Sequence, residues 1–141
     1  MINYLYFYFI KNMKVIRVTQ IKKLHNKQYI IDYLSYLVKQ DESLSVKYSL
    51  ALESNLPNED YYVILDLTTN EVIPAYMHCK NQEAIWLWIH PNYRNQGYGK
   101  YLVDKLNIKY ALTLESSVPF WNKLGFKQVN CKRGSITMKK V

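Results

Sequence analysis

The chain has 141 residues, the length of a single domain that can bury most of its apolar surface. Apolar residues make up 49% and charged residues 21%, so an intrinsically disordered chain is excluded. The net charge of +8 favours an anionic partner, but it does not choose among nucleic acid, a membrane surface and a phosphorylated cofactor.

The first twelve residues stand apart from the rest of the chain. The apolar run Tyr4–Ile10 is too short to cross a membrane, and no basic residue precedes it as in a signal peptide. Residues 1–12 are therefore expected to form either an extension of uncertain order or an extra strand or oligomer contact. The domain itself is expected to run from residue 13 to residue 141.

Strand and helix patterns alternate through the first half of this domain. Lys14–Thr19 is rich in β-branched residues and predicts a strand, and helical spacing of apolar residues predicts an amphipathic helix over about 20–39. Residues 43–56 fit either a strand or a second short helix. Tyr61–Leu67 and Val72–His78 then predict two strands joined as a hairpin.

The second half continues the same mixture. The apolar run Ala84–Ile89 predicts a strand covered on both faces, and about 98–108 predicts a helix. Tyr110–Leu114 predicts a short strand, and Phe120–Leu124 predicts a short helix for which Pro119 is an alternative start. The last two strands are expected at Phe126–Asn130 and Ser135–Lys140. The order predicts a mixed α/β sheet.

Two cysteines, Cys79 and Cys131, lie far apart and lack the paired spacing of a zinc site. His25 and His78 have no metal-type partner at ligand spacing either. We therefore expect no metal site, two packed and reduced thiols, and a cytoplasmic protein.

The segment RNQGYG, residues 94–99, follows one predicted strand and precedes a predicted helix. Backbone N–H groups at a helix N-terminus are unpaired and carry partial positive charge, so they bind anions. Glycine at positions 97 and 99 removes Cβ atoms that would keep a bulky diphosphate from the backbone. Arg94 and Lys100 add full charges, and the segment predicts an anion site.

Two common phosphate-binding motifs do not fit this segment. A Walker loop needs four residues between its first glycine and its Gly-Lys-Ser/Thr end, which is longer than the spacing here. The dinucleotide fingerprint needs a third glycine where this chain has Leu102.

The segment resembles the central signature of the GNAT superfamily of acetyltransferases, Gln/Arg-x-x-Gly-x-Gly/Ala. The wider stretch WLWIHPNYRNQGYGKYLVDKL, residues 86–106, is similar to that motif along its length, and PFWNKLGFK, residues 119–127, resembles a late family element. The resemblance covers roughly residues 13–141. It implies a mixed, mostly antiparallel sheet of about six to seven strands, with flanking helices and a splay between the fourth and fifth strands.

The same resemblance implies acetyl-CoA as a co-substrate, with no metal. The diphosphate would lie on the amides of the glycine segment, and the pantetheine arm would pair like an added strand with the preceding strand. The residues this assigns to acetyl-CoA are Leu87, Trp88, Ile89, Arg94, Asn95, Gln96, Gly97, Tyr98, Gly99 and Lys100.

Two carboxylates are candidates for a catalytic base. Glu83 stands where histone-type members of the superfamily carry a base glutamate, and partial desolvation by apolar neighbours would suit it to that role. It could equally begin its strand on the solvent side, and Glu115 is a second candidate. Many members supply an acid from a tyrosine four residues before the late glycine. Trp121 stands there instead, and an indole N–H is no proton acid near neutral pH.

The resemblance implies an N-acetyltransferase that moves an acetyl group to a primary amine by direct attack on the thioester. The amine could belong to a small molecule, a protein or an aminoacyl-tRNA. The alternative is a degenerate member that binds CoA and acts as an interaction or nucleic-acid-binding protein, although the basic residues are scattered along the chain. A monomer or homodimer without a membrane partner is expected.

Overall fold

The computed structural model describes residues 12–17, 60–69 and 71–141. The predicted helix over about 20–39, the ambiguous segment 43–56 and all but the last residue of the extension 1–12 lie outside the described residues. Within the described ranges, no helix is long and apolar enough to cross a membrane.

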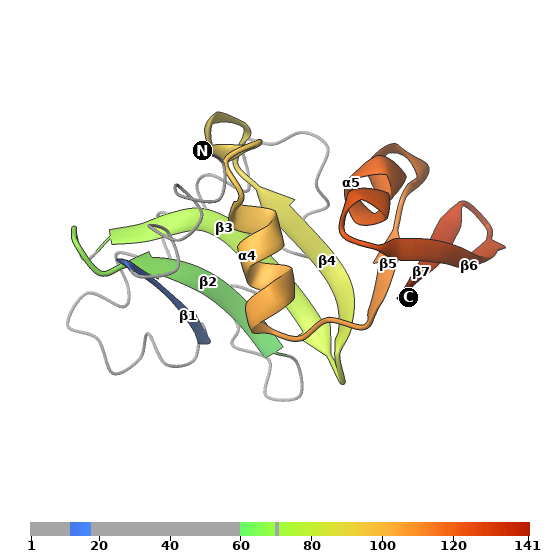
Figure 1. Cartoon of the computed structure of the whole chain (residues 1–141), viewed down its shortest axis with the longest axis horizontal. Coiled ribbons are helices and arrows are strands. Elements are labelled where there is room, and N and C mark those ends of the chain that lie inside the picture. Colours follow the sequence, from blue (N-terminus) through green and yellow to red (C-terminus); the bar gives the residue numbers. More distant parts are fainter. Residues whose placement is uncertain (1–11, 18–59, 70) are drawn as a thin grey trace.

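Seven strands form one sheet in the order β1-β2-β3-β4-β5-β7-β6 (Figure 1). β4 and β5 are parallel, and the other neighbouring pairs are antiparallel. The predicted fold class is therefore confirmed, including the mostly antiparallel sheet. The strands are β1 (Met13–Arg17), β2 (Asp60–Asp66), β3 (Glu71–Lys80), β4 (Glu83–Ile89), β5 (Tyr110–Thr113), β6 (Phe126–Lys132) and β7 (Ser135–Lys140).

Two α-helices accompany the sheet in the described residues, α4 (Tyr98–Lys105) and α5 (Val118–Lys123). Short 3-10 turns, η2 (Pro91–Tyr93) and η3 (Glu115–Ser117), precede them. The first helix ends three residues before its predicted end because Asn107 adopts a left-handed conformation, φ 52°, which stops the helical ladder. The second begins two residues early, with a proline in its first turn.

The main hydrophobic core lies between α4 and the face of the sheet that it covers (Figure 1). Alternation along the strands places every second side chain on this face, where α4 and α5 exclude water. Its most deeply buried members include Ile64, Ala75, Met77, Leu102, Ile108, Ala111 and Met138. The core fixes the position of α4 against β3 and β4, and thereby the loop that leads into α4.

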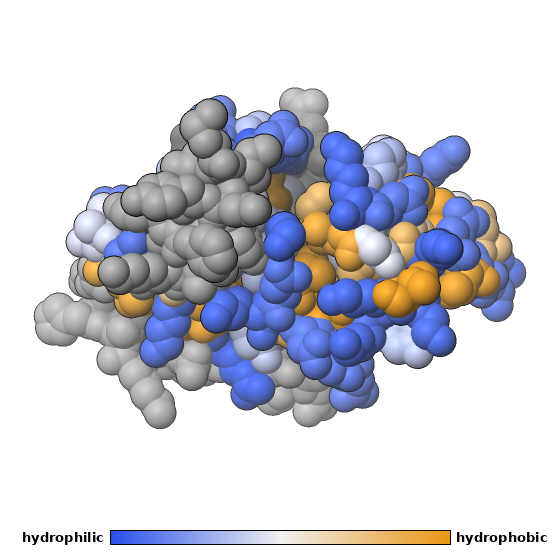
Figure 2. All heavy atoms as spheres, in the orientation of Figure 1, coloured by the Kyte–Doolittle hydropathy of each residue, from blue (hydrophilic) through white to orange (hydrophobic). Residues whose placement is uncertain are grey.

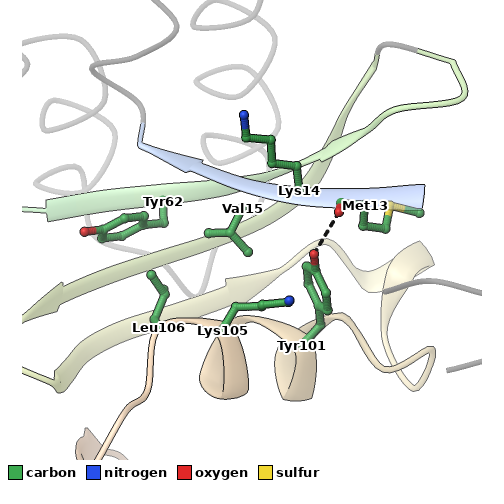
Figure 3. Close-up of a pocket in the computed structure, with 7 residues that line it drawn as sticks. All are labelled: Met13, Lys14, Val15, Tyr62, Tyr101, Lys105 and Leu106. Atoms are coloured by element: carbon green, nitrogen blue, oxygen red, sulfur yellow. Dashed lines mark hydrogen bonds between the residues drawn. The ribbon is translucent and has the colours of Figure 1, made fainter. Parts of the chain in front are cut away.

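A cavity of about 300 Å³ lies between β1 and the C-terminal half of α4 (Figure 3). The Tyr101 hydroxyl at its edge donates a 3.0 Å hydrogen bond to the Met13 carbonyl. Lys105 points toward Tyr101, whereas Lys14 points away from the cavity. The lining residues are Met13, Lys14, Val15, Tyr62, Tyr101, Lys105 and Leu106. The cavity lies on the β1 side of α4, away from the β4 and β5 strands described below.

Replacing Tyr101 with phenylalanine is expected to lower the free energy of unfolding by about 1–2 kcal/mol. The ring would still pack, but the buried Met13 carbonyl would lose its donor. Urea denaturation of the two proteins measures the difference. Tyr110→Phe is the matched control, because its ring is 41% exposed and its loss of a hydroxyl should cost almost nothing. Equal losses in both variants would contradict a role for the buried hydrogen bond.

Both cysteines are free thiols in the structure. Cys79 is buried in the core, as expected, but Cys131 is exposed on β6. The expectation of two packed thiols was therefore wrong for Cys131, because β6 is an edge strand of the sheet and its side chains after Phe126 are exposed.

Candidate active site

The strands β4 and β5 pair at two positions and then separate (Figure 1). Glu83 lies opposite Tyr110 and Ala84 opposite Ala111, and no further pair follows in their register. Beyond this fork, β4 remains paired with β3 and β5 remains paired with β7. One edge of β4 therefore faces a gap, which is the splay expected between the fourth and fifth strands.

The main chain of β4 presents two residues to this gap. The His90 N–H donates to the Pro74 carbonyl on β3 at 2.9 Å, and successive residues of a strand direct their polar groups to opposite sides. Ile89 and Leu87 therefore direct their N–H and C=O groups toward the gap, whereas Trp88 directs its groups toward β3. The Trp88 side chain is 3% exposed. Of the three strand residues predicted to hold pantetheine, the geometry thus favours Leu87 and Ile89.

The loop between β4 and α4, residues 90–97, ends at the N-terminus of α4 and is called the anion loop below. Asn95 and Gly97 both have left-handed backbones, φ 62° and 91°, and Gly97 is the N-cap. The first helical bond runs from the Tyr101 N–H to the Gly97 carbonyl at 3.0 Å. The N–H groups of residues 98–100 therefore precede the first bond of the helical ladder and point out of the helix end. In the loop before them, residues with positive and negative φ alternate, a conformation that directs successive N–H groups to one side. This arrangement suits an anion.

The two glycines serve different purposes. A Cβ added to Gly97 would have no atom within 4 Å, so glycine is favoured there by its positive φ. A Cβ added to Gly99 would lie 2.9 Å from Cζ of Phe120 on α5. Gly99 therefore allows α5 to pack closely on α4, a reason that differs from the expected approach of a diphosphate.

The predicted cations and polar side chains of the loop make contacts with the loop itself and with the adjoining ends of β4 and α4. Arg94 Nε donates to the Ile89 carbonyl at 2.8 Å, which ties the guanidinium to the open edge of β4. Lys100 forms an ion pair with Asp104 at 3.0 Å, and both are exposed. The Gln96 amide donates to the Asn92 carbonyl at 3.0 Å. The charge of Arg94 thus lies beside the gap, and that of Lys100 lies on the first turn of α4.

Tyr98, the first residue of α4, is 8% exposed and packs against Tyr93 with ring centres 6.0 Å apart. Burial, followed by the nearby Tyr93 and Asp66, raises the pKa of Tyr98 above its ordinary value of 10.0. The phenol therefore stays neutral where an unfolded chain would release its proton. The folded state therefore loses stability relative to the unfolded state once the pH exceeds the ordinary pKa of a tyrosine.

The sign of this effect gives a measurable pH dependence. Below pH 10 the folded and unfolded chains both hold the Tyr98 proton, and above it the unfolded chain releases the proton first. The free energy of unfolding should therefore fall as the pH rises above 10, and it should fall less steeply in Tyr98→Phe. Denaturation at a series of pH values from neutral upward measures both slopes. Parallel slopes would show that Tyr98 does not contribute.

A bulge in β4 determines which face carries Glu83. His78 lies opposite Trp86, but Cys79 lies opposite Ala84, so Ile85 is an extra residue on β4. Glu83 and Trp86 therefore share the face of the sheet that points away from α4. Strict alternation from Ile89 would have put Glu83 on the α4 face. Glu83 is half-buried at the fork, one pair before the strands separate.

Trp121 occupies the core rather than the gap. It is 3% exposed, and its ring packs edge-to-face on Phe120 and Phe126 at 5.1 and 5.0 Å. The second candidate base, Glu115, is exposed in η3. The open edge of β4 thus runs from the fork beside Glu83 to the anion loop at the other end of the strand, while Trp121 contributes packing.

A family model described as an acetyltransferase (GNAT) domain matches residues 57–128 of the chain. This range contains the fork, the anion loop and both helices. No curated protein sequence matches the chain. Among the described residues, no group of three or more metal-ligating side chains is arranged to hold a metal ion.

Solved structures of acetyltransferases share the fold at low sequence identity. An aminoglycoside 6′-N-acetyltransferase complexed with coenzyme A has a TM-score of 0.62 at 17% identity, covering 91% of this chain and 95% of that chain. A GNAT-family acetyltransferase from Staphylococcus aureus Mu50 has a TM-score of 0.59 at 16% identity, covering 91% and 98%. A mutant spermidine N-acetyltransferase from Vibrio cholerae has a TM-score of 0.56 at 12% identity, covering 91% and 92%.

Proposed function

Because the chain belongs to the GNAT family of acetyltransferases, we propose that it moves an acetyl group from acetyl-CoA to the nitrogen of a primary amine. The observation that carries the proposal is the fork between β4 and β5, which opens directly into the anion loop at the start of α4. A long cofactor with a charged diphosphate at one end and an extended amide arm needs these two features side by side.

The amides and cations of residues 94–100 would hold the diphosphate of acetyl-CoA. The Gly97 conformation leaves open space at its Cα, and the first turn of α4 directs its amides outward. From there the pantetheine arm would run along β4 and pair with the main chain of Leu87 and Ile89, as an added strand pairs with a sheet edge. Trp88 would act from the opposite face, through packing rather than through hydrogen bonds.

Apolar surface follows the proposed path of the arm. Figure 2 shows hydrophilic side chains over α4 and a group of apolar side chains next to them, over the region of β4, β5 and α5. Leu87 on β4 and Phe120 on α5 are partly buried, and both lie close to Gly99. Apolar walls suit the methylene groups of the arm and exclude water from the fork.

Acetyl-CoA supplies an activated acetyl group as a thioester. Glu83, beside the fork, would take a proton from the incoming ammonium ion and so free its lone pair. The amine nitrogen then forms the C–N bond as the C–S bond breaks, and its second proton passes to the departing sulfur directly or through water. No acid from the position of Trp121 is needed in this sequence, which agrees with its burial in the core.

The test is a pair of measurements on the wild-type protein. Calorimetric titration should show binding of acetyl-CoA, and incubation with acetyl-CoA and amines should release the free thiol of CoA, detected with a disulfide reagent. Folded protein that binds no acetyl-CoA would refute the proposal. Binding without thiol release from a broad amine panel would favour instead a member of the family that binds CoA without catalysis.

A further inference from the structure

The face of the sheet away from α4 carries exposed apolar side chains just beyond the fork. Tyr110 lies opposite Glu83, so alternation places Leu112 on the same face, and the extended backbone of Leu114 continues the row. These three side chains are 41%, 38% and 67% exposed. Exposed apolar side chains scattered singly are common on protein surfaces, but three in a row beside a candidate active site point to a ligand.

The β4 arm of the fork supplies an aromatic wall on the same face. Trp86 is half-buried, and its ring meets Tyr76 edge-on with ring centres 5.0 Å apart. Its partner His78 is two residues from Lys80, the partner of Glu83, so Trp86 lies about 7 Å along the sheet from Glu83. An amine held by Glu83 would therefore have Trp86 and Leu112 on its two sides.

The charges around Glu83 limit what kind of amine this space accepts. In register across the sheet, Glu83 lies between Lys80 on β3 and Tyr110 on β5, and Lys139 on β7 follows. Lys139 Nζ lies 5.9 Å from the centre of the Tyr110 ring. Among the members of this row that the structure describes, Glu83 is the one carboxylate and its charged neighbours are cations, so an acceptor with several positive charges would be repelled by them.

We propose that the acceptor is an amine with one positive charge and an apolar body. This inference rests on the proposed function. The ammonium group would be drawn to Glu83 at the fork, and the apolar body would lie along Leu112 and Leu114 on one side and Trp86 on the other. Such an acceptor differs from the polycations in the names of two structural neighbours, the aminoglycoside and spermidine acetyltransferases.

The experiment compares acceptors at saturating acetyl-CoA. Hexylamine and 2-phenylethylamine carry one charge and an apolar body, ethanolamine is a small polar monoamine, and spermidine is a polycation. We expect kcat/KM for the two apolar amines to exceed that for ethanolamine and spermidine by about tenfold or more. Values for spermidine or ethanolamine equal to those for hexylamine would overturn the proposal.

A variant and a matched control locate the apolar site. Leu112→Gln keeps the size of an exposed side chain and should raise KM for hexylamine by about tenfold while leaving acetyl-CoA binding unchanged. Val129→Gln changes a more exposed apolar residue on β6, 57% against 38% for Leu112, away from the fork, and should change neither KM nor acetyl-CoA binding. Equal effects of the two variants on KM would place the apolar body elsewhere.

Calorimetric titration of the CoA-loaded protein with hexylamine separates this inference from the proposed function. Hexylamine binding that Leu112→Gln weakens would support the acceptor site even if no amine is acetylated, in which case the proposed catalysis alone fails. Absence of hexylamine binding to protein that binds CoA would overturn the acceptor proposal.

Discussion

Replacing Gly97 with glutamate is expected to weaken acetyl-CoA binding by about 10- to 100-fold, measured by calorimetric titration. Gly97 is the N-cap of α4, and its Cα faces open space where the diphosphate would approach the helix end. A carboxylate at this position would compete for the outward-pointing amides and would repel the negative charges of the diphosphate. Weaker binding with unchanged folding, seen by circular dichroism, is the result that supports the site.

Gly97→Ala is the matched control for the backbone. Both substitutions place a Cβ on a residue with φ 91°, which costs each about 1–2 kcal/mol of stability, but alanine adds no charge. Alanine should therefore lower the free energy of unfolding as much as glutamate does and should leave most of the affinity intact. Equal loss of affinity in both variants would mean that the backbone conformation, and not the charge, determines binding.

Replacing Glu83 with glutamine is expected to lower kcat for acetyl transfer by about 10²- to 10⁴-fold, the usual contribution of a general base. The amide keeps the size of the side chain but cannot accept the proton of the ammonium ion at neutral pH. The dissociation constant for acetyl-CoA should stay the same, because Glu83 lies before the fork and not on the open edge of β4. Initial rates at saturating acetyl-CoA and titration of each variant measure the two quantities.

Glu115→Gln provides the comparison. Glu115 is an exposed carboxylate in η3, near the end of β5, and its removal changes the net charge by the same amount. It should leave kcat within about twofold of the wild-type value, as is usual for an exposed surface change. A large loss from Glu115→Gln with little from Glu83→Gln would reverse the assignment of the base.

The sequence predicted the parts of this site that depend on local patterns. The hairpin of β2 and β3, the strand β4 and the helix after the glycine segment all follow from short-range periodicity and from the special conformations of glycine. The splay was implied by resemblance alone, since nothing in the residues of β4 or β5 marks where their pairing ends. Phe120 and Gly99, which bring α5 close to α4 next to the splay, meet only through tertiary packing.

The face of Glu83 could not be predicted by counting. A β-bulge leaves no composition signal in AIWLWI, because apolar residues occupy both faces of the strand. For the same reason, the residues 84–89 do not show in the sequence which main-chain groups face the gap. The role of Trp121 was open for a related reason: the motif gives the position of a side chain along a helix, but the aromatic neighbours that bury it come from tertiary packing.

The extra residue Ile85 shifts the alternation of side chains along β4, so the residues before it and after it follow two different alternations. On the side of the anion loop, the main chain of Leu87 and Ile89 faces the gap, and on the other side Glu83 faces away from α4 while Ala84 lies in the core. The bulge is one residue long, so under the proposed function Glu83 could be exchanged without altering the backbone of Leu87 and Ile89 that would pair with the cofactor. In such a strand the acetyl donor could stay the same while the amine acceptor changes. That change would need substitutions at only a few residues at the fork, and not a different domain.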